Sequence, residues 1–150
     1  MSKLKITALC FTAALFLVIQ SCNKRNETKI SAAGGTKSHN MGQNCMNCHV
    51  SGGRGEGWFN AAGTAYSSIT NTVCKNPVVQ LYTERNGGGQ LVATINGDAY
   101  GNFYTTESIN FGSGLYPVVT GGGANFMTQS ITQGACNSCH GVSTAQITAD

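Results

Sequence analysis

The chain has 150 residues, with 9 Lys and Arg, 6 Asp and Glu, 20 Gly, 2 Pro and 7 Cys. This length suits one domain with small appendages. Without Lys3 and Lys5, which lie in a segment that we expect to be cleaved, seven basic residues face six acidic ones and the net charge is +1. Nucleic-acid binding needs a strongly basic face, so this balance argues against a nucleic-acid partner. The cysteines are numerous, and their spacing is the most informative feature.

Residues 1–21 are predicted to form a lipoprotein signal peptide. A short basic start precedes an apolar run from Ile6 to Ile19, which is shorter than the roughly 20 residues of a transmembrane helix. The ending Ile19-Gln20-Ser21-Cys22 resembles the lipobox of bacterial lipoproteins, in which cleavage precedes a cysteine that carries diacylglycerol. Cys22 is therefore the expected lipidation site, and an ordinary signal peptide with an incidental cysteine is the alternative. Lipid chains at this position would anchor the protein to a membrane of the cell envelope.

Residues 22–38 are predicted to form a lipidated, flexible tether. They contain charged and small polar residues and a single large aliphatic residue, Ile30. Such a segment has too little apolar surface to fold by itself. The tether would let the folded domain move away from the membrane surface.

Residues 39–57 are predicted to form a first haem-binding segment. Cys45, Cys48 and His49 make a Cys-X-X-Cys-His motif, the attachment signature of c-type haem. The two thiols can reach the two vinyl groups of one porphyrin, and the adjacent histidine then faces the iron as its proximal ligand. His39 could fold back as the distal ligand of this haem, could reach a second haem, or could be a solvent-exposed residue at the end of the tether. A glycine-rich loop, residues 50–57, follows the motif.

Residues 58–125 are predicted to form a β-sandwich. Short runs rich in β-branched and aromatic residues show partial alternation and are separated by Gly- and Asn-rich turns. The runs cover residues 63–66, 78–83, 90–95, 102–106 and 115–120. Asp98 is expected to form a turn rather than to act as a catalyst, and Pro117 should place the last run at a sheet edge. The expected fold class is mainly β, a small Gly-rich β-sandwich flanked by two haem-binding segments.

Residues 126–150 are predicted to form the second haem-binding segment. Cys136, Cys139 and His140 repeat the Cys-X-X-Cys-His motif. Met127 is a candidate distal ligand of the second haem, and a core methionine is the alternative. Cys74 belongs to neither motif and is expected to be either a buried thiol or the partner of an intermolecular disulfide.

Two other chemistries fit paired Cys-X-X-Cys motifs. Four cysteines could form a structural zinc site, or each pair could form a disulfide in an exported protein. Neither chemistry requires a histidine directly after the second cysteine. With 3 His in 150 residues, chance places one there about one time in 50, and at both motifs roughly one time in 2,500. The motifs therefore favour haem.

Four segments between the motifs resemble the carboxypeptidase-regulatory, or transthyretin-like, β-sandwich family. They are Ala62-Gly63-Thr64-Ala65-Tyr66, Val79-Gln80-Leu81-Tyr82, Gly97-Asp98-Ala99-Tyr100-Gly101-Asn102-Phe103 and Gly114-Leu115-Tyr116-Pro117-Val118. In that family an Asp-X-X-Gly-X-Phe turn links two strands. The flanking segments resemble small exported c-type cytochromes, in which His-Asn precedes the first motif by a few residues. The resemblance implies a sandwich inserted between two haem attachment sites.

The sequence thus predicts a membrane-anchored dihaem c-type cytochrome that transfers single electrons in the bacterial cell envelope, on the periplasmic or outer-membrane side. Its cofactors would be two covalent haems, and its partners other redox proteins of the envelope. We expect an electron carrier rather than an enzyme, because the carboxylates are scattered and no nucleophile elbow or phosphate-binding loop is present. A small haem peroxidase and a haem-stabilised adhesion or binding module are the alternatives.

Overall fold

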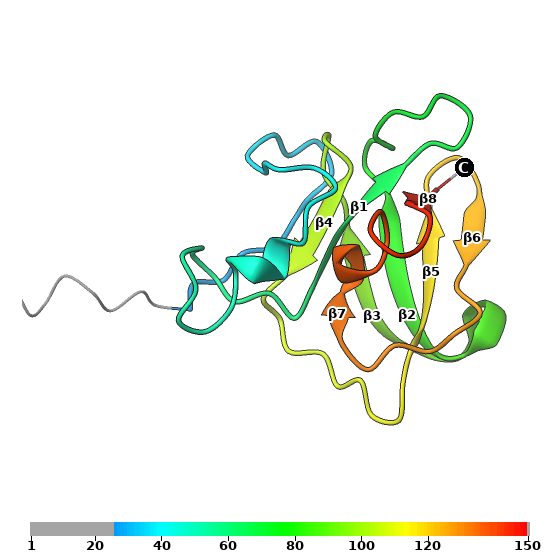
Figure 1. The fold of residues 1–150 in the computed structure, drawn as a ribbon. Helices are drawn as coiled ribbons and strands as arrows, with labels where there is room; N and C mark the ends of the chain where they lie inside the picture. Colours follow the sequence, from blue (N-terminus) through cyan, green and yellow to red (C-terminus); the bar gives the residue numbers. More distant parts are fainter. Residues whose placement is uncertain (1–25, 150) are drawn as a thin grey trace, which may run out of the picture.

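A computed structural model describes residues 26–149 (Figure 1). The predicted signal peptide, the lipidation site Cys22 and the start of the predicted tether lie outside this range. Within it the chain forms eight strands and three short 3₁₀ turns, and the expected mainly β fold class is confirmed. The strands are β1 (Ala61–Tyr66), β2 (Val78–Glu84), β3 (Gly88–Asn96), β4 (Asn102–Thr105), β5 (Tyr116–Thr120), β6 (Ala124–Phe126), β7 (Gly134–Ala135) and β8 (Ile147–Thr148). The turns are η1 (Cys45–Asn47), η2 (Arg85–Gly87) and η3 (Cys136–Ser138).

The strands form two sheets. One has the order β3-β2-β5-β6, with antiparallel neighbours throughout. In the other, β4 pairs antiparallel with one edge of β1, while β7 and β8 pair parallel with the opposite edge. No helix among residues 26–149 is long and apolar enough to cross a bilayer.

The hydrophobic core lies between the two sheets. Along β2, buried and more exposed side chains alternate, as in a strand with one face in the core. Val79 and Leu81 are almost fully buried. The opposite sheet contributes small side chains from β1 and Phe103 from β4. The buried cluster consists of Ala61, Ala65, Val79, Leu81, Ile95, Phe103, Leu115, Val119 and Ala149. Because both sheets supply it, the arrangement is sandwich-like.

The five predicted runs correspond to β1 to β5, and the turn chemistry is also as expected. One carboxylate oxygen of Asp98 accepts hydrogen bonds from the backbone N–H groups of Tyr100 and Asn102. This bonding closes the turn that leads into β4.

The expectation for Pro117 is wrong, because β5 lies inside its sheet between β2 and β6. The carbonyl of Pro117 accepts from the backbone N–H of Met127, at the point where the pairing of β5 with β6 ends. A residue's N–H and C=O point to the same side of a strand, so the missing N–H of Pro117 also falls at the end of this ladder. The proline is therefore tolerated in an internal strand.

The predicted second haem-binding segment, residues 126–150, is part of the sheet rather than an appendage. Its two short strands β7 and β8 pair with the first and second halves of β1, and η3 with its motif is the connection between them. Both ends of this connection are therefore held on the same strand. The short strands were not predicted, because two-residue pairings leave no periodic signal in the sequence.

Residues 29–35 fall in the predicted flexible tether, but in the structure they are docked on the edge of β4. Ser31 is buried, exchanges hydrogen bonds with the backbone of Tyr104, and donates to the carbonyl of Asn96. The backbone carbonyl of Lys29 accepts from Thr106, and Ile30 bridges to Thr105. Backbone pairing needs no apolar side chains, and β4 would otherwise be an open edge strand. The segment docks there for that reason.

Candidate functional site

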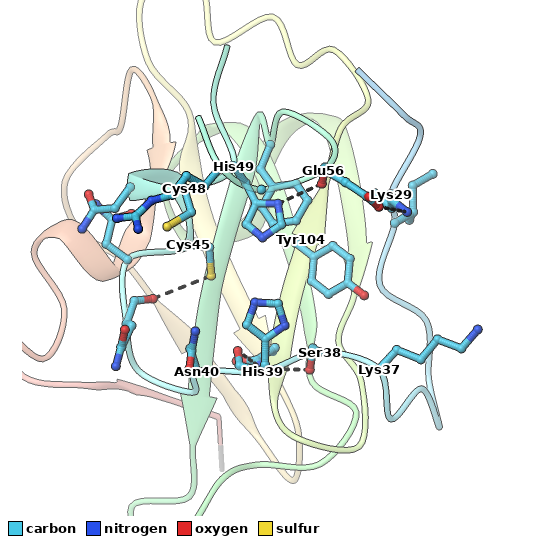
Figure 2. Close-up of a pocket in the computed structure, with 18 of the residues that line it drawn as sticks. Lys29, Lys37, Ser38, His39, Asn40, Cys45, Cys48, His49, Glu56 and Tyr104 are labelled. Carbon is cyan, nitrogen blue, oxygen red and sulfur yellow. Dashed lines mark hydrogen bonds and ion pairs between the residues drawn. The ribbon is translucent and has the colours of Figure 1, made fainter. Parts of the chain in front are cut away.

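The first Cys-X-X-Cys-His motif opens onto a large pocket on the outer face of the β4–β1 sheet (Figure 2). Its volume is about 1050 Å³, which is at the upper end of the roughly 300–1,000 Å³ of typical ligand sites. Asn102 and Tyr104 of β4 face this pocket, whereas Phe103 between them points into the core. Successive side chains of β4 point to opposite faces of the sheet, so this strand lies between the pocket and the core.

The 3₁₀ turn η1 presents the two thiols of the first motif. The side chain of Asn44 caps the turn by accepting from the backbone N–H of Met46, and the N–H groups of Cys48 and His49 both donate to the carbonyl of Cys45. Cys45 is half-buried and Cys48 is exposed, and both line the pocket.

His49 is held in one orientation by a hydrogen bond and a ring stack. Its Nδ1 lies 2.9 Å from the carbonyl oxygen of Glu56. A carbonyl can only accept, so Nδ1 carries the proton and Nε2 is left with a free lone pair for a metal. The ring stacks on Phe59 at 4.2 Å with an interplanar angle of 8°, and Phe59 stacks on Tyr104 at 4.9 Å.

The glycine-rich loop after the motif wraps closely around His49. The N–H of Gly55 donates to the carbonyl of Cys48 at 2.8 Å. A Cβ added at Gly55 would lie 2.6–2.8 Å from three ring atoms of His49. Glycine at this position therefore lets the loop deliver the Glu56 carbonyl to Nδ1.

His39 lies opposite His49 across the pocket (Figure 2), with ring centroids 6.0 Å apart and an interplanar angle of 37°. A metal–imidazole bond of about 2.0–2.1 Å, with the nitrogen about 1.2 Å from the ring centre, puts two imidazoles on opposite sides of one metal roughly 6.4 Å apart. The observed separation is close to this value. His39 is also exposed to solvent, so its position fits both the distal place at the first motif and the exposed end of the tether.

The second motif has the same local architecture. The N–H groups of Cys139 and His140 donate to the carbonyl of Cys136 in η3. Nδ1 of His140 lies 2.7 Å from the carbonyl oxygen of Ala145, so this ring also keeps Nε2 for a metal. Both motif histidines thus hydrogen-bond a backbone carbonyl through Nδ1, as metal-ligating imidazoles typically do.

Met127 and His140 lie next to different sheets, unlike His39 and His49, which face one pocket. It follows β6 at the outer edge of the β3-β2-β5-β6 sheet, whereas His140 lies in the connection that β7 and β8 hold on β1. This placement adds no support for Met127 as the distal ligand of the second site.

The geometry of the cysteines does not favour the alternative chemistries. Among residues 26–149, no three or more His, Cys, Asp or Glu side chains are gathered closely enough to hold a metal ion, and all four motif cysteines belong to that range. Burial raises the pKa of the Cys45 thiol, and raises the pKa of Cys136 to about 12. Redox-active Cys-X-X-Cys pairs have the opposite property, a thiol with a lowered pKa.

Basic and phenolic groups lie on the side of the pocket away from the cysteines. Figure 2 shows Cys45 and Cys48 on one side of the histidine pair and Lys29, Lys37 and Tyr104 on the other. Lys29 is bonded to Glu27 at 3.0 Å and to Glu56 at 3.4 Å, and these contacts, Glu27 first, raise its pKa. Partial burial, with a smaller contribution from Asp98, raises the pKa of Tyr104.

Comparisons of the chain with protein-family models, with curated proteins and with solved structures gave no significant match. The resemblances to the transthyretin-like sandwich and to small exported cytochromes therefore stay predictions.

We expect Gly55→Ala to displace the ring of His49, because the added methyl group would overlap it. Overpacking of this kind costs about 1–3 kcal/mol of stability. The imidazole NMR signals of His49 should shift in this variant. Gly52→Ala is the control in the same loop, since a Cβ there meets nothing within 4 Å. Gly52→Ala strains the backbone but should leave the His49 signals in place. Equal shifts in both variants would contradict the conclusion that Gly55 lies directly against the His49 ring.

Proposed function

We propose that the protein is a lipid-anchored dihaem c-type cytochrome that transfers single electrons in the bacterial cell envelope. Cys45 and Cys48 would hold one haem, with His49 as the proximal ligand, and Cys136, Cys139 and His140 would hold the other. The observation that carries the proposal is the 6.0 Å separation of the His39 and His49 rings beside two thiols. One metal fits between these rings.

The position of the basic groups supports the same placement of the first haem. In a porphyrin of the haem c type, the propionates lie on the edge opposite the two vinyl groups. With the vinyl groups at Cys45 and Cys48, the propionates would lie toward Lys37 and Tyr104, and toward Lys29, which would exchange its ion pairs with Glu27 and Glu56 for them. Cationic and phenolic donors at this edge would bind the two carboxylates.

The chain's residues would orient the cofactor and set its properties. Haem supplies an iron that changes between ferric and ferrous states. His39 and His49 would both hold the iron of the first haem, which would leave no position for a substrate and would favour simple electron transfer. The carbonyl of Glu56 holds the imidazole of His49 through Nδ1, and the stack with Phe59 fixes the ring plane. Because both imidazoles are already in place, the geometry of the site would change little when the iron changes its oxidation state.

The haem content tests the proposal directly. We expect two covalently bound haems per chain, because each motif has its own pair of thiols, and one haem in either Cys48→Ala or Cys139→Ala. A pyridine haemochrome assay on purified protein, with haem staining after denaturing electrophoresis, measures this number. Zinc near one per chain with no covalent haem would show that the proposed function is wrong.

His39→Ala should convert one of the two haems from low spin to high spin, because an axial position is vacated. That haem should then bind carbon monoxide in the ferrous state, which absorption spectra detect, and the covalent haem count should not change. Met41→Leu is the control in the same loop, since Met41, unlike His39, does not line the pocket and should be spectrally silent. If His39→Ala is also silent, His39 is not an axial ligand.

Membrane attachment depends on Cys22 in this proposal. Cys22→Ala should move the protein from the membrane fraction to the soluble fraction, because acyl chains supply most of the binding energy. Fractionation with a high-salt wash measures the distribution. A variant that still sediments with membranes after the wash would exclude lipid anchoring at this residue.

A further inference from the structure

We propose that Asn137, which lies inside the second Cys-X-X-Cys-His motif, is a positioning residue for His39 at the first haem site. The inference rests on the proposed function and adds to it a physical connection between the two sites. Asn137 is 3% exposed, although it sits in a motif whose other intervening residue, Ser138, is exposed.

The side chain of Asn137 joins three parts of the chain. Its Oδ1 accepts from the backbone N–H of Thr64 at 2.8 Å, in the middle of β1. Its Nδ2 donates to the carbonyl of Gly42 at 3.2 Å, in the loop that carries His39. The same Nδ2 lies 3.4 Å from the carbonyl of His140 in its own motif. The amide therefore uses both its acceptor and its donor group in a buried position.

Asn137 takes the place of a missing strand next to β1. Strand β7 pairs with residues 61 and 62, and β8 pairs with residues 65 and 66. The N–H of Thr64 lies between these two pairings, where no strand backbone is available. A buried N–H without a partner is costly, and the Asn137 side chain supplies the partner.

The loop that carries His39 is held at both ends by the same network. At its start, Nδ2 of Asn102 donates to Oγ of Ser38 at 2.8 Å and lies 3.5 Å from the carbonyl of His39. At its end, the N–H of Gly42 donates to Oγ1 of Thr64, and the Gly42 carbonyl accepts from Asn137. Thr64 in turn donates to Asn102 at 2.6 Å, which closes the network.

This arrangement makes the position of His39 depend on a residue of the other motif. Loss of the Asn137 amide would release the Gly42 carbonyl, which is three residues from His39. An axial bond tolerates little displacement of its imidazole. The first site should therefore lose distal ligation when the change is made in the second motif.

The experiment measures the spin state of the first haem in Asn137 variants of the complete protein. Asn137→Ala should raise the high-spin, carbon monoxide-binding fraction of one haem roughly tenfold, because a buried hydrogen bond is broken and its partner is left unsatisfied. Ser138→Ala is the matched control, because Oγ of Ser138 bonds only within its own turn, to the carbonyl of Ala135 and beside Cys139. It should leave both haem spectra unchanged.

Asn137→Asp keeps the test valid if Asn137→Ala does not fold. A carboxylate can still accept from Thr64 but cannot donate to Gly42, so this variant should show the same spectral change with β1 intact. In the double variant with His39→Ala, the Asn137 change should have no further effect on the first haem, since two changes that act through one ligand are not additive.

The outcomes separate this inference from the proposed function. Two covalent haems and a spectral change in His39→Ala, with no change at the first haem in either Asn137 variant, would overturn the positioning role alone. A lower melting temperature with unaltered haem spectra would do the same, because it assigns Asn137 a structural role only. Absence of covalent haem in the unmodified protein would overturn the proposed function as well.

Discussion

Strand β1 is the element on which the rest of the structure depends, because it is buried along almost its whole length and on both faces. One face lies in the core between the sheets, and the other is covered by the loop that leads to the first motif. Both edges are also paired, with β4 on one side and with β7 and β8 on the other. The residues Ala61 to Ala65 are all small, which allows neighbours to approach this closely. At Gly63 an added Cβ would lie only 3.0 Å from the Cβ of Cys136.

The convergence on β1 explains how two motifs about 90 residues apart in the chain lie side by side. The first motif precedes β1 and returns to it through Phe59, whose N–H donates to the carbonyl of His49. The second motif leaves β1 at the end of β7 and comes back to it at β8. The contact of Asn137 with Gly42 shows the two segments in direct hydrogen-bond contact. In the proposed cytochrome, the sandwich would be the rigid support for both haems.

The sandwich also preorganises the first pocket without adding helices. Tyr104 and Phe59 form a stack behind His49, and the glycine-rich loop encloses its ring from the other side. Docking of residues 29–35 along β4 covers the edge of the sheet that forms the pocket wall. The imidazole of His49 is therefore held in one orientation by the chain itself. Rigid strands maintain such a geometry more accurately than a loop does.

The sequence by itself determined the features that depend on neighbouring residues. The strands β1 to β5 follow from β-branched runs between turn residues, and Asp98 closes its turn by accepting from the backbone N–H groups of Tyr100 and Asn102. The two motifs could be recognised because thiols and histidine at a fixed spacing suit one porphyrin. Only the tertiary structure decided that His39 faces His49, that Asn137 is buried between the two motifs, and that residues 29–35 dock on β4. These features depend on which strand edges remain unpaired after the sheets have formed. Spacing along the chain contains no information about that, since hydrogen bonds between segments tens of residues apart leave no periodic pattern.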